Sequence, residues 1–134
     1  MKTVLLVLFS FFLMPSALKA QEYDNNKIYF FYQPFCPHCH KAMDYIQTKY
    51  LDIKMELVNI NESRKHYKLF VICAGKFRLG NQVGTPLFCM PDSYIMGWSP
   101  EEQTKLDAYI EKHFPNRPVN KDKDAPVQDA PSEN

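Results

Sequence analysis

Residues 27–45 read KIYFFYQPFCPHCHKAMDY, a run whose character changes halfway along. Its first part, Ile28–Tyr32, is β-branched or aromatic at every position and predicts a buried strand. Pro34 breaks this strand. From Pro37 onward the composition favours a helix, because proline suits the first helical turn, where a missing N–H costs nothing. Cys36 therefore stands where a strand passes into the N-terminus of a helix.

This position predicts an activated cysteine. Unpaired N–H groups and the positive end of the helix dipole stabilise a thiolate at a helix N-terminus. They can lower the pKa of a cysteine from about 8.5 by one to several units. Cys39 follows three residues after Cys36, so one sulfur can attack a disulfide and the other can resolve the product. The pair predicts thiol–disulfide exchange.

His38 lies between the two cysteines. We expect its imidazole to stabilise the thiolate by charge or by hydrogen bonding, which would make the disulfide more oxidising. The alternative is an exposed helical residue with no electronic role. His40 has no predicted role.

The first 20 residues predict a signal peptide that is cleaved after Ala20. Lys2 precedes an apolar run over residues 4–14, and small residues flank the cleavage site. The apolar run is too short to span a bilayer, so we expect no membrane span after cleavage. Export would place the protein in the periplasm or outside the cell, where disulfides persist.

Length and charge limit how many domains the remaining chain can form and which partners it can bind. The full chain has 134 residues, 16 of them basic and 15 acidic. Without Lys2 and Lys19 its net charge is about −1, and nothing indicates a nucleic-acid partner. Residues 21–115 predict one domain. Residues 116–134 lose apolar side chains and gain Pro, Asp and Lys, which predicts a disordered tail.

The next two elements follow from periodicity. Residues 53–60 alternate between apolar and polar side chains and predict a second strand. Asn61 is a candidate cap for a second helix. The expected apolar face of that helix comprises Tyr67, Phe70, Val71 and Ala74.

The last third predicts a hairpin and a helix. Residues 87–90 and 94–96 read as two strands joined by a turn at Pro91-Asp92. Ser99 is expected to cap the last helix, with Pro100 at its first position and Glu102 completing a capping box. The predicted element order is βαβαββα.

This order and four short motifs resemble the thioredoxin superfamily. The sequence Cys36-Pro-His-Cys39 is similar to the active site of the periplasmic oxidases of the DsbA type. Cys39-His40-Lys41, Gly84-Thr85-Pro86 and Gly97-Trp98-Ser99-Pro100 are more similar to the catalytic domains of DsbC and DsbG isomerases. The resemblance implies an α/β thioredoxin-like fold, with a four-stranded mixed sheet flanked by helices.

The resemblance also implies roles for individual residues. Cys36 is the nucleophile and Cys39 the resolving thiol, within a catalytic motif that includes Pro37 and His38. Thr85 and Pro86 would bind substrate. A cis bond before Pro86 would present the Thr85 backbone beside the Cys36 sulfur, where a substrate strand can pair with it. The alternative for Pro86 is a trans proline that opens a strand.

These expectations together describe an exported thiol–disulfide oxidoreductase. It would act on cysteine-containing exported proteins, would be recharged by a second redox protein, and would need no cofactor. We expect a monomer. The sequence leaves the direction of electron flow open between oxidase, isomerase and reductase.

The other two cysteines leave an alternative open. Cys73 falls late in the second predicted helix and Cys89 in the third predicted strand. They either form a structural disulfide, which export favours, or remain two buried thiols.

Three other classes of protein compete with the redox interpretation. One is a redox-inactive structural or interaction module, which ranks low because Cys36 and Cys39 are both present. Cys36-x-x-Cys39-His40 is formally the attachment pattern of c-type haem. A strand leading directly into the motif does not suit a cytochrome. A zinc site built from all four cysteines is the third alternative, although their spacing fits zinc ribbons poorly.

Overall fold

The computed structural model describes residues 22–118. The predicted signal peptide and residues 119–134 of the predicted tail lie outside the described residues. The elements follow the expected order and add a short 3₁₀ helix, η1. They are β1 (Ile28–Tyr32), α1 (Pro37–Lys49), β2 (Met55–Asn59), α2 (Arg64–Lys76), η1 (Gly80–Gln82), β3 (Leu87–Cys89), β4 (Tyr94–Met96) and α3 (Pro100–His113).

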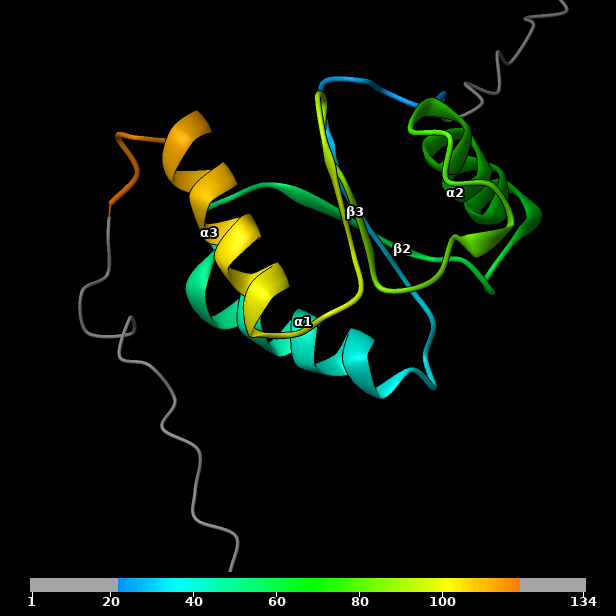
Figure 1. The fold of residues 1–134 in the computed structure, drawn as a ribbon, viewed down its shortest axis with the longest axis horizontal. Coiled ribbons are helices and arrows are strands. Elements are labelled where there is room, and N and C mark those ends of the chain that lie inside the picture. Colours follow the sequence, from blue (N-terminus) through cyan, green and yellow to red (C-terminus); the bar gives the residue numbers. More distant parts are fainter. Residues whose placement is uncertain (1–21, 119–134) are drawn as a thin grey trace, which may run out of the picture.

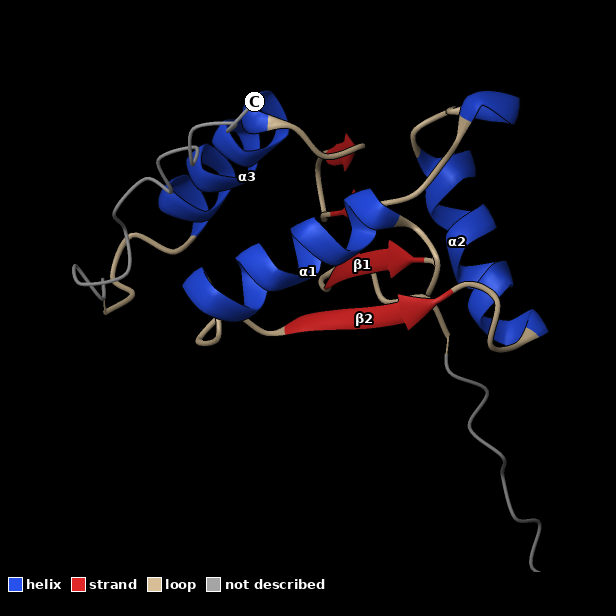
Figure 2. Cartoon of the chain, turned by 90° about the horizontal axis from the view of Figure 1, so that it is seen from below, coloured by secondary structure: helices blue, strands red, loops and turns tan. Residues whose placement is uncertain are grey.

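The four strands form one mixed sheet in the order β2-β1-β3-β4. β1 and β2 are parallel, and Figure 2 shows them side by side. β3 is antiparallel to β1 and pairs with β4 as the expected hairpin. This topology confirms the predicted thioredoxin-like α/β fold.

The sheet is covered on both faces because β1 alternates its side chains between them. α1 and α3 lie on one side of the strands and α2 on the other (Figure 1). Ile28 and Phe30 face α1 and α3, whereas Tyr29 and Phe31 belong to the core beneath α2. A strand buried on both faces reads as a continuous apolar run, which is why Ile28–Tyr32 could be recognised from sequence.

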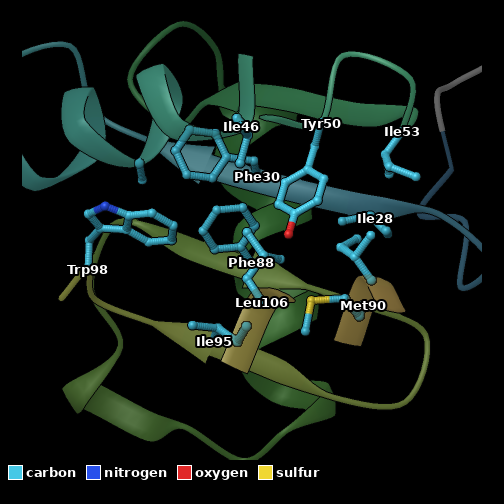
Figure 3. Close-up of a cluster of buried hydrophobic side chains, with 12 residues drawn as sticks. Ile28, Phe30, Ile46, Tyr50, Ile53, Phe88, Met90, Ile95, Trp98 and Leu106 are labelled. Carbon is cyan, nitrogen blue, oxygen red and sulfur yellow. The ribbon is translucent and has the colours of Figure 1, made fainter. Parts of the chain in front are cut away.

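The larger core lies between the sheet and α1 with α3 (Figure 3). The Phe88 ring stands 4.7 Å from that of Phe30 and 5.7 Å from that of Trp98, centroid to centroid. Leu106 of α3 and Ile46 of α1 complete the packing around them. This core holds the helix that begins at the CPHC motif against the sheet.

A disulfide fastens the single helix on the other face. Cys73 of α2 is bonded to Cys89 of β3, with an S–S distance of 2.12 Å and a Cα–Cα distance of 6.3 Å. That Cα separation lies within the usual range for disulfides. Both residues are fully buried. Of the two alternatives for these cysteines, the structure contains the disulfide.

α2 differs from its prediction in both its start and its buried face. Ser63 is the N-cap, and its hydroxyl accepts a hydrogen bond from the His66 N–H at 3.1 Å. The Asn61 N–H instead binds the side chain of Asn59 in a turn. Tyr67 and Val71 are 55% and 48% exposed, so their assignment to the buried face was wrong. The buried face comprises Leu69, Phe70, Cys73 and Ala74.

The N-terminus of α3 agrees closely with the sequence prediction. Ser99 is the N-cap, Pro100 follows at the first helical position, and the Glu101 N–H donates to the Ser99 hydroxyl. The Ser99 hydroxyl also contacts the Glu102 carboxylate. Leu106 and Ile110 are buried as expected.

The folded part extends slightly beyond the predicted boundary at residue 115. Arg117, which the sequence assigned to the tail, donates to the Lys49 carbonyl at 3.0 Å and to the Asp52 carboxylate at 3.2 Å. Its guanidinium lies 4.5 Å from the centroid of the Tyr50 ring. Within residues 22–118, no helix is both long enough and apolar enough to cross a bilayer.

Candidate active site

Cys36 is the N-cap residue of α1. Its backbone is extended, with φ −93° and ψ 110°, and its sulfur accepts a hydrogen bond from the Cys39 N–H at 3.3 Å. The sulfur thus takes the place that a serine or aspartate oxygen occupies in an ordinary helix cap. Cys36 is half-buried, whereas Cys39 is 1% exposed. The sulfur of Cys36 is therefore the accessible one of the pair.

The two thiols differ in acidity. Partial burial acts to raise the pKa of Cys36, but hydrogen bonds from the Cys39 thiol and the Cys39 N–H outweigh it, so the pKa is lowered. Burial raises the pKa of Cys39 to about 11, and its hydrogen bond to Cys36 acts in the same direction. Cys36 is the sulfur that loses a proton first, and Cys39 the one that retains it.

The loop before β3 brings Thr85 to this sulfur. The Thr85–Pro86 peptide bond is cis, the form that the resemblance implies. The Cys36 sulfur lies 3.7 Å from the Thr85 carbonyl oxygen, across 49 positions of sequence. Pro86 is fully buried, and its carbonyl accepts from the Gly97 N–H at 2.8 Å. The two motifs therefore face each other at one edge of the sheet.

Side chains that the sequence did not single out connect these loops. The Gln33 side-chain oxygen accepts from the Thr85 hydroxyl at 3.2 Å, and the Gln33 side-chain nitrogen donates to Asn61 at 3.5 Å. The His40 ring is hydrogen-bonded to the Pro34 carbonyl. Gln33 follows β1, Asn61 follows β2 and Thr85 precedes β3, so one amide spans three loops. No local motif marks such a long-range contact.

The CPHC motif contains two exposed residues, Pro37 and His38. Pro37 occupies the first position of α1. The His38 N–H points toward the Cys36 sulfur and contributes to lowering its pKa. Its imidazole forms no hydrogen bond or ion pair within residues 22–118. The electronic role expected for the His38 ring stays a prediction.

Phe35 lies in the turn between β1 and α1 and is not among the residues that the sequence singled out. Its side chain is 95% exposed, the largest fraction among the exposed large hydrophobic residues, and it immediately precedes Cys36. The sequence signal that could have drawn attention to Phe35 is its position, since it is an apolar residue next to a predicted nucleophile.

The alternatives to redox chemistry are constrained by the same geometry. The Cys73–Cys89 disulfide occupies two of the four cysteines that the zinc alternative requires. Among the described residues, no group of three or more His, Cys, Asp and Glu side chains is arranged to hold a metal ion. The Cys39 side chain, which haem attachment would use, lies on the buried face of α1.

Comparison with known proteins shows distant structural similarity and no match in sequence. No protein-family model matches the chain, and no curated protein matches it by sequence. A solved buckwheat glutaredoxin–glutathione complex is similar with a TM-score of 0.42 and 10% sequence identity, covering 69% of this chain and 76% of that chain. The function proposed below therefore rests on the residues around Cys36.

Proposed function

We propose that this protein is an exported thiol–disulfide oxidoreductase related to the DsbA, DsbC and DsbG type. It exchanges disulfides with cysteines of other exported proteins through Cys36 and Cys39. The observation that carries the proposal is the unequal placement of the two sulfurs: Cys36 is the accessible N-cap of α1 and accepts from the Cys39 N–H, whereas Cys39 is buried. In keeping with this placement, the pKa of Cys36 is lowered and that of Cys39 is raised. A nucleophile and a resolving thiol require this difference.

The first step uses the dithiol form that the structure describes. The Cys36 thiolate attacks one sulfur of a substrate disulfide. A Cys36–substrate disulfide forms, the substrate S–S bond breaks, and the second substrate sulfur leaves as a thiolate that takes a proton from water. The Cys39 N–H and thiol donors stabilise the Cys36 thiolate before attack.

The second step depends on a change in the acidity of Cys39. Once Cys36 carries the substrate, its negative charge has gone, and one of the causes that raise the Cys39 pKa is removed. Cys39 then loses its proton to water and attacks the Cys36 sulfur. The substrate leaves as a second thiolate, and the protein is left with a Cys36–Cys39 disulfide. The substrate gains two electrons, and the reverse sequence oxidises a substrate dithiol.

Thr85, Pro86 and His38 have supporting roles in this proposal. The Thr85 backbone, next to the cis bond before Pro86, would pair with an extended substrate segment. The exposed His38 would favour the Cys36 thiolate when its ring is protonated.

The remaining features of the proposal concern partners and location. A periplasmic or secreted monomer would act on cysteine-containing exported proteins and would be recharged by a second redox protein. The reduction potential decides whether the Cys36–Cys39 pair donates or accepts electrons in that setting. Equilibration with glutathione buffers measures that potential and distinguishes a reductase from an oxidase.

Trapping of the mixed disulfide tests the proposed function. Cys39→Ser prevents the resolving step, so covalent complexes with cysteine-containing exported proteins should accumulate. They should be visible on non-reducing gels and should disappear with reductant. Cys36→Ser is the matched control and should give none, because the remaining thiol is buried and burial raises its pKa. A folded Cys39→Ser protein that traps no partner would contradict the proposal.

A further inference from the structure

Phe35 combines two properties that no other described residue shares. It is 95% exposed, and it is bonded directly to the residue that carries the accessible sulfur. A phenylalanine ring left in water forgoes the free energy that burial would provide. The loop that carries it is held in place, since the Cys36 N–H donates to the Gln33 carbonyl at 3.2 Å and the His40 ring is bonded to the Pro34 carbonyl.

The two loops that flank the sulfur contain no carboxylate. No Asp or Glu occurs in residues 27–41 or 78–91. Met96 of β4 is 37% exposed, and its sulfur lies 3.3 Å from the Gly84 nitrogen, next to Thr85. Exposed apolar side chains thus lie near both loops between which the Cys36 sulfur is held.

Other exposed apolar residues lie elsewhere in the fold. Leu51 is 75% exposed but follows the opposite end of α1, and Tyr67 and Val71 lie on the outer side of α2. Of the exposed large hydrophobic residues in the described part of the chain, only Phe35 is a direct neighbour of Cys36, and their Cα atoms are about 3.8 Å apart. Any chain joined to Cys36 through a disulfide therefore brings the residues beside its own cysteine within reach of the Phe35 ring.

We propose that Phe35 is a substrate-contact residue that favours cysteines flanked by apolar side chains. This inference rests on the proposed thiol–disulfide exchange at Cys36 and adds a specificity to it. An apolar residue beside the substrate cysteine buries area against the Phe35 ring in the mixed disulfide and in the transition state that leads to it. A polar neighbour gains nothing there.

Two short peptides test this inference, each with one cysteine activated as its mixed disulfide with thionitrobenzoate. One carries leucine on both sides of the cysteine and the other serine. The Cys36 thiolate attacks the peptide sulfur, a Cys36–peptide disulfide forms, and thionitrobenzoate leaves as a coloured thiolate. Release of this thiolate from the reduced wild-type protein gives a second-order rate constant for each peptide. We expect the leucine peptide to react about tenfold faster, as partial burial of one aromatic ring allows.

Variants assign this selectivity to Phe35. In Phe35→Ser the ratio of the two rate constants should fall close to one, whereas Leu51→Ser, which removes another exposed apolar side chain far from the sulfur, should keep the wild-type ratio. Alkylation by iodoacetamide, which is too small to use the ring, should proceed at the same rate in all three proteins and so shows that the thiolate is intact.

The outcomes separate this inference from the function on which it rests. Equal rate constants for the two peptides in the wild type, or a ratio that survives in Phe35→Ser, would overturn the inference and leave the proposed exchange standing. A fall in the iodoacetamide rate that matches the fall for the leucine peptide would also overturn it, because Phe35 would then act on the thiolate. Failure of the wild type to react with either peptide would overturn both proposals.

Discussion

At the scale of single residues, Cys36 and Cys39 are chemically identical but differ in exposure and in pKa, because they lie three residues apart at the start of α1. Cys36 caps α1 and receives the hydrogen bonds of its first turn, while Cys39 lies one turn inside the helix and is buried. The same hydrogen bond between the sulfurs lowers the pKa of Cys36 and raises that of Cys39. Each cysteine thus helps to define the role of the other.

The lowered pKa of Cys36 predicts the pH dependence of its alkylation. Only the thiolate reacts, so the rate should rise with pH to a plateau and should fall about tenfold for each pH unit below the pKa. Because the pKa is lowered, the midpoint should lie below the value of about 8.5 for a free cysteine. The rate of iodoacetamide labelling of the reduced protein, measured against pH, gives this midpoint.

The Cys36→Ser variant is the control for this titration. Its remaining reduced thiol, Cys39, is buried, and burial raises its pKa, so labelling should be negligible over the range in which the wild type titrates. A wild-type midpoint at or above about 8.5 would contradict the activated nucleophile.

At the scale of helices and strands, the sequence predicted an element correctly where its local signal allowed one interpretation. The Ser99 cap with Pro100 fixed the start of α3, and the apolar run Ile28–Tyr32 fixed β1. The start of α2 was missed because Asn61 and Ser63 are both good caps, and choosing Asn61 placed the start two residues early. The expected apolar face was likewise misassigned at Tyr67 and Val71.

In the candidate active site, too, the features that depend on neighbouring residues could be predicted from sequence, whereas those that depend on distant residues could not. The position of Cys36 at the helix N-terminus followed from residues within one turn. The approach of Thr85 to its sulfur was expected only because a known family is similar, since nothing in the sequence relates positions 49 residues apart. The Gln33 contacts with Thr85 and Asn61 depend on three loops meeting at one edge of the sheet, and they could not be read from the chain.

The Cys73–Cys89 disulfide, which joins α2 to β3, should contribute measurably to the free energy of unfolding. Cys73 and Cys89 are 16 residues apart, and closing a loop of that length is worth about 3 kcal/mol of unfolding free energy. Replacing both by alanine removes the bridge without burying a hydroxyl group. In a Cys36→Ser background, where no second intramolecular bridge can form between the active-site cysteines, urea unfolding without reductant should show that loss.

A strong reductant provides the control for the disulfide. When the Cys73–Cys89 bond is reduced on unfolding, the parent protein loses the constraint, and the difference between it and the double alanine variant should shrink to the cost of the two small side-chain truncations. Equal stabilities without reductant would mean that the bridge contributes nothing to the fold.

At the scale of the whole molecule, the sheet separates the site from the parts that stabilise it. The carboxyl ends of the parallel strands β1 and β2 and the start of β3 meet at one edge, where Cys36, Asn61 and Thr85 lie. Near the other end of α1, the Asp107 carboxylate of α3 accepts from the hydroxyls of Tyr45 and Tyr50 and pairs with Lys49. This cluster joins α1 to α3 without occupying the reactive edge, so the sulfur stays accessible.

The contacts of Arg117 indicate that the folded domain extends at least to this residue. Its side chain is 14% exposed, stacks on Tyr50 and bonds Lys49 and Asp52. Arg117→Ala should therefore lower the unfolding free energy by about 1–2 kcal/mol through loss of the cation–π contact and the hydrogen bond to the Lys49 carbonyl. Asp52→Ala removes only a partly exposed ion pair and should cost less, below about 1 kcal/mol.

Truncation after Pro118, which keeps Arg117, should leave the free energy of unfolding unchanged, since the residues removed offer little apolar surface. Urea unfolding of the three variants measures these differences, and a truncated chain as destabilised as Arg117→Ala would move the end of the folded unit beyond Pro118.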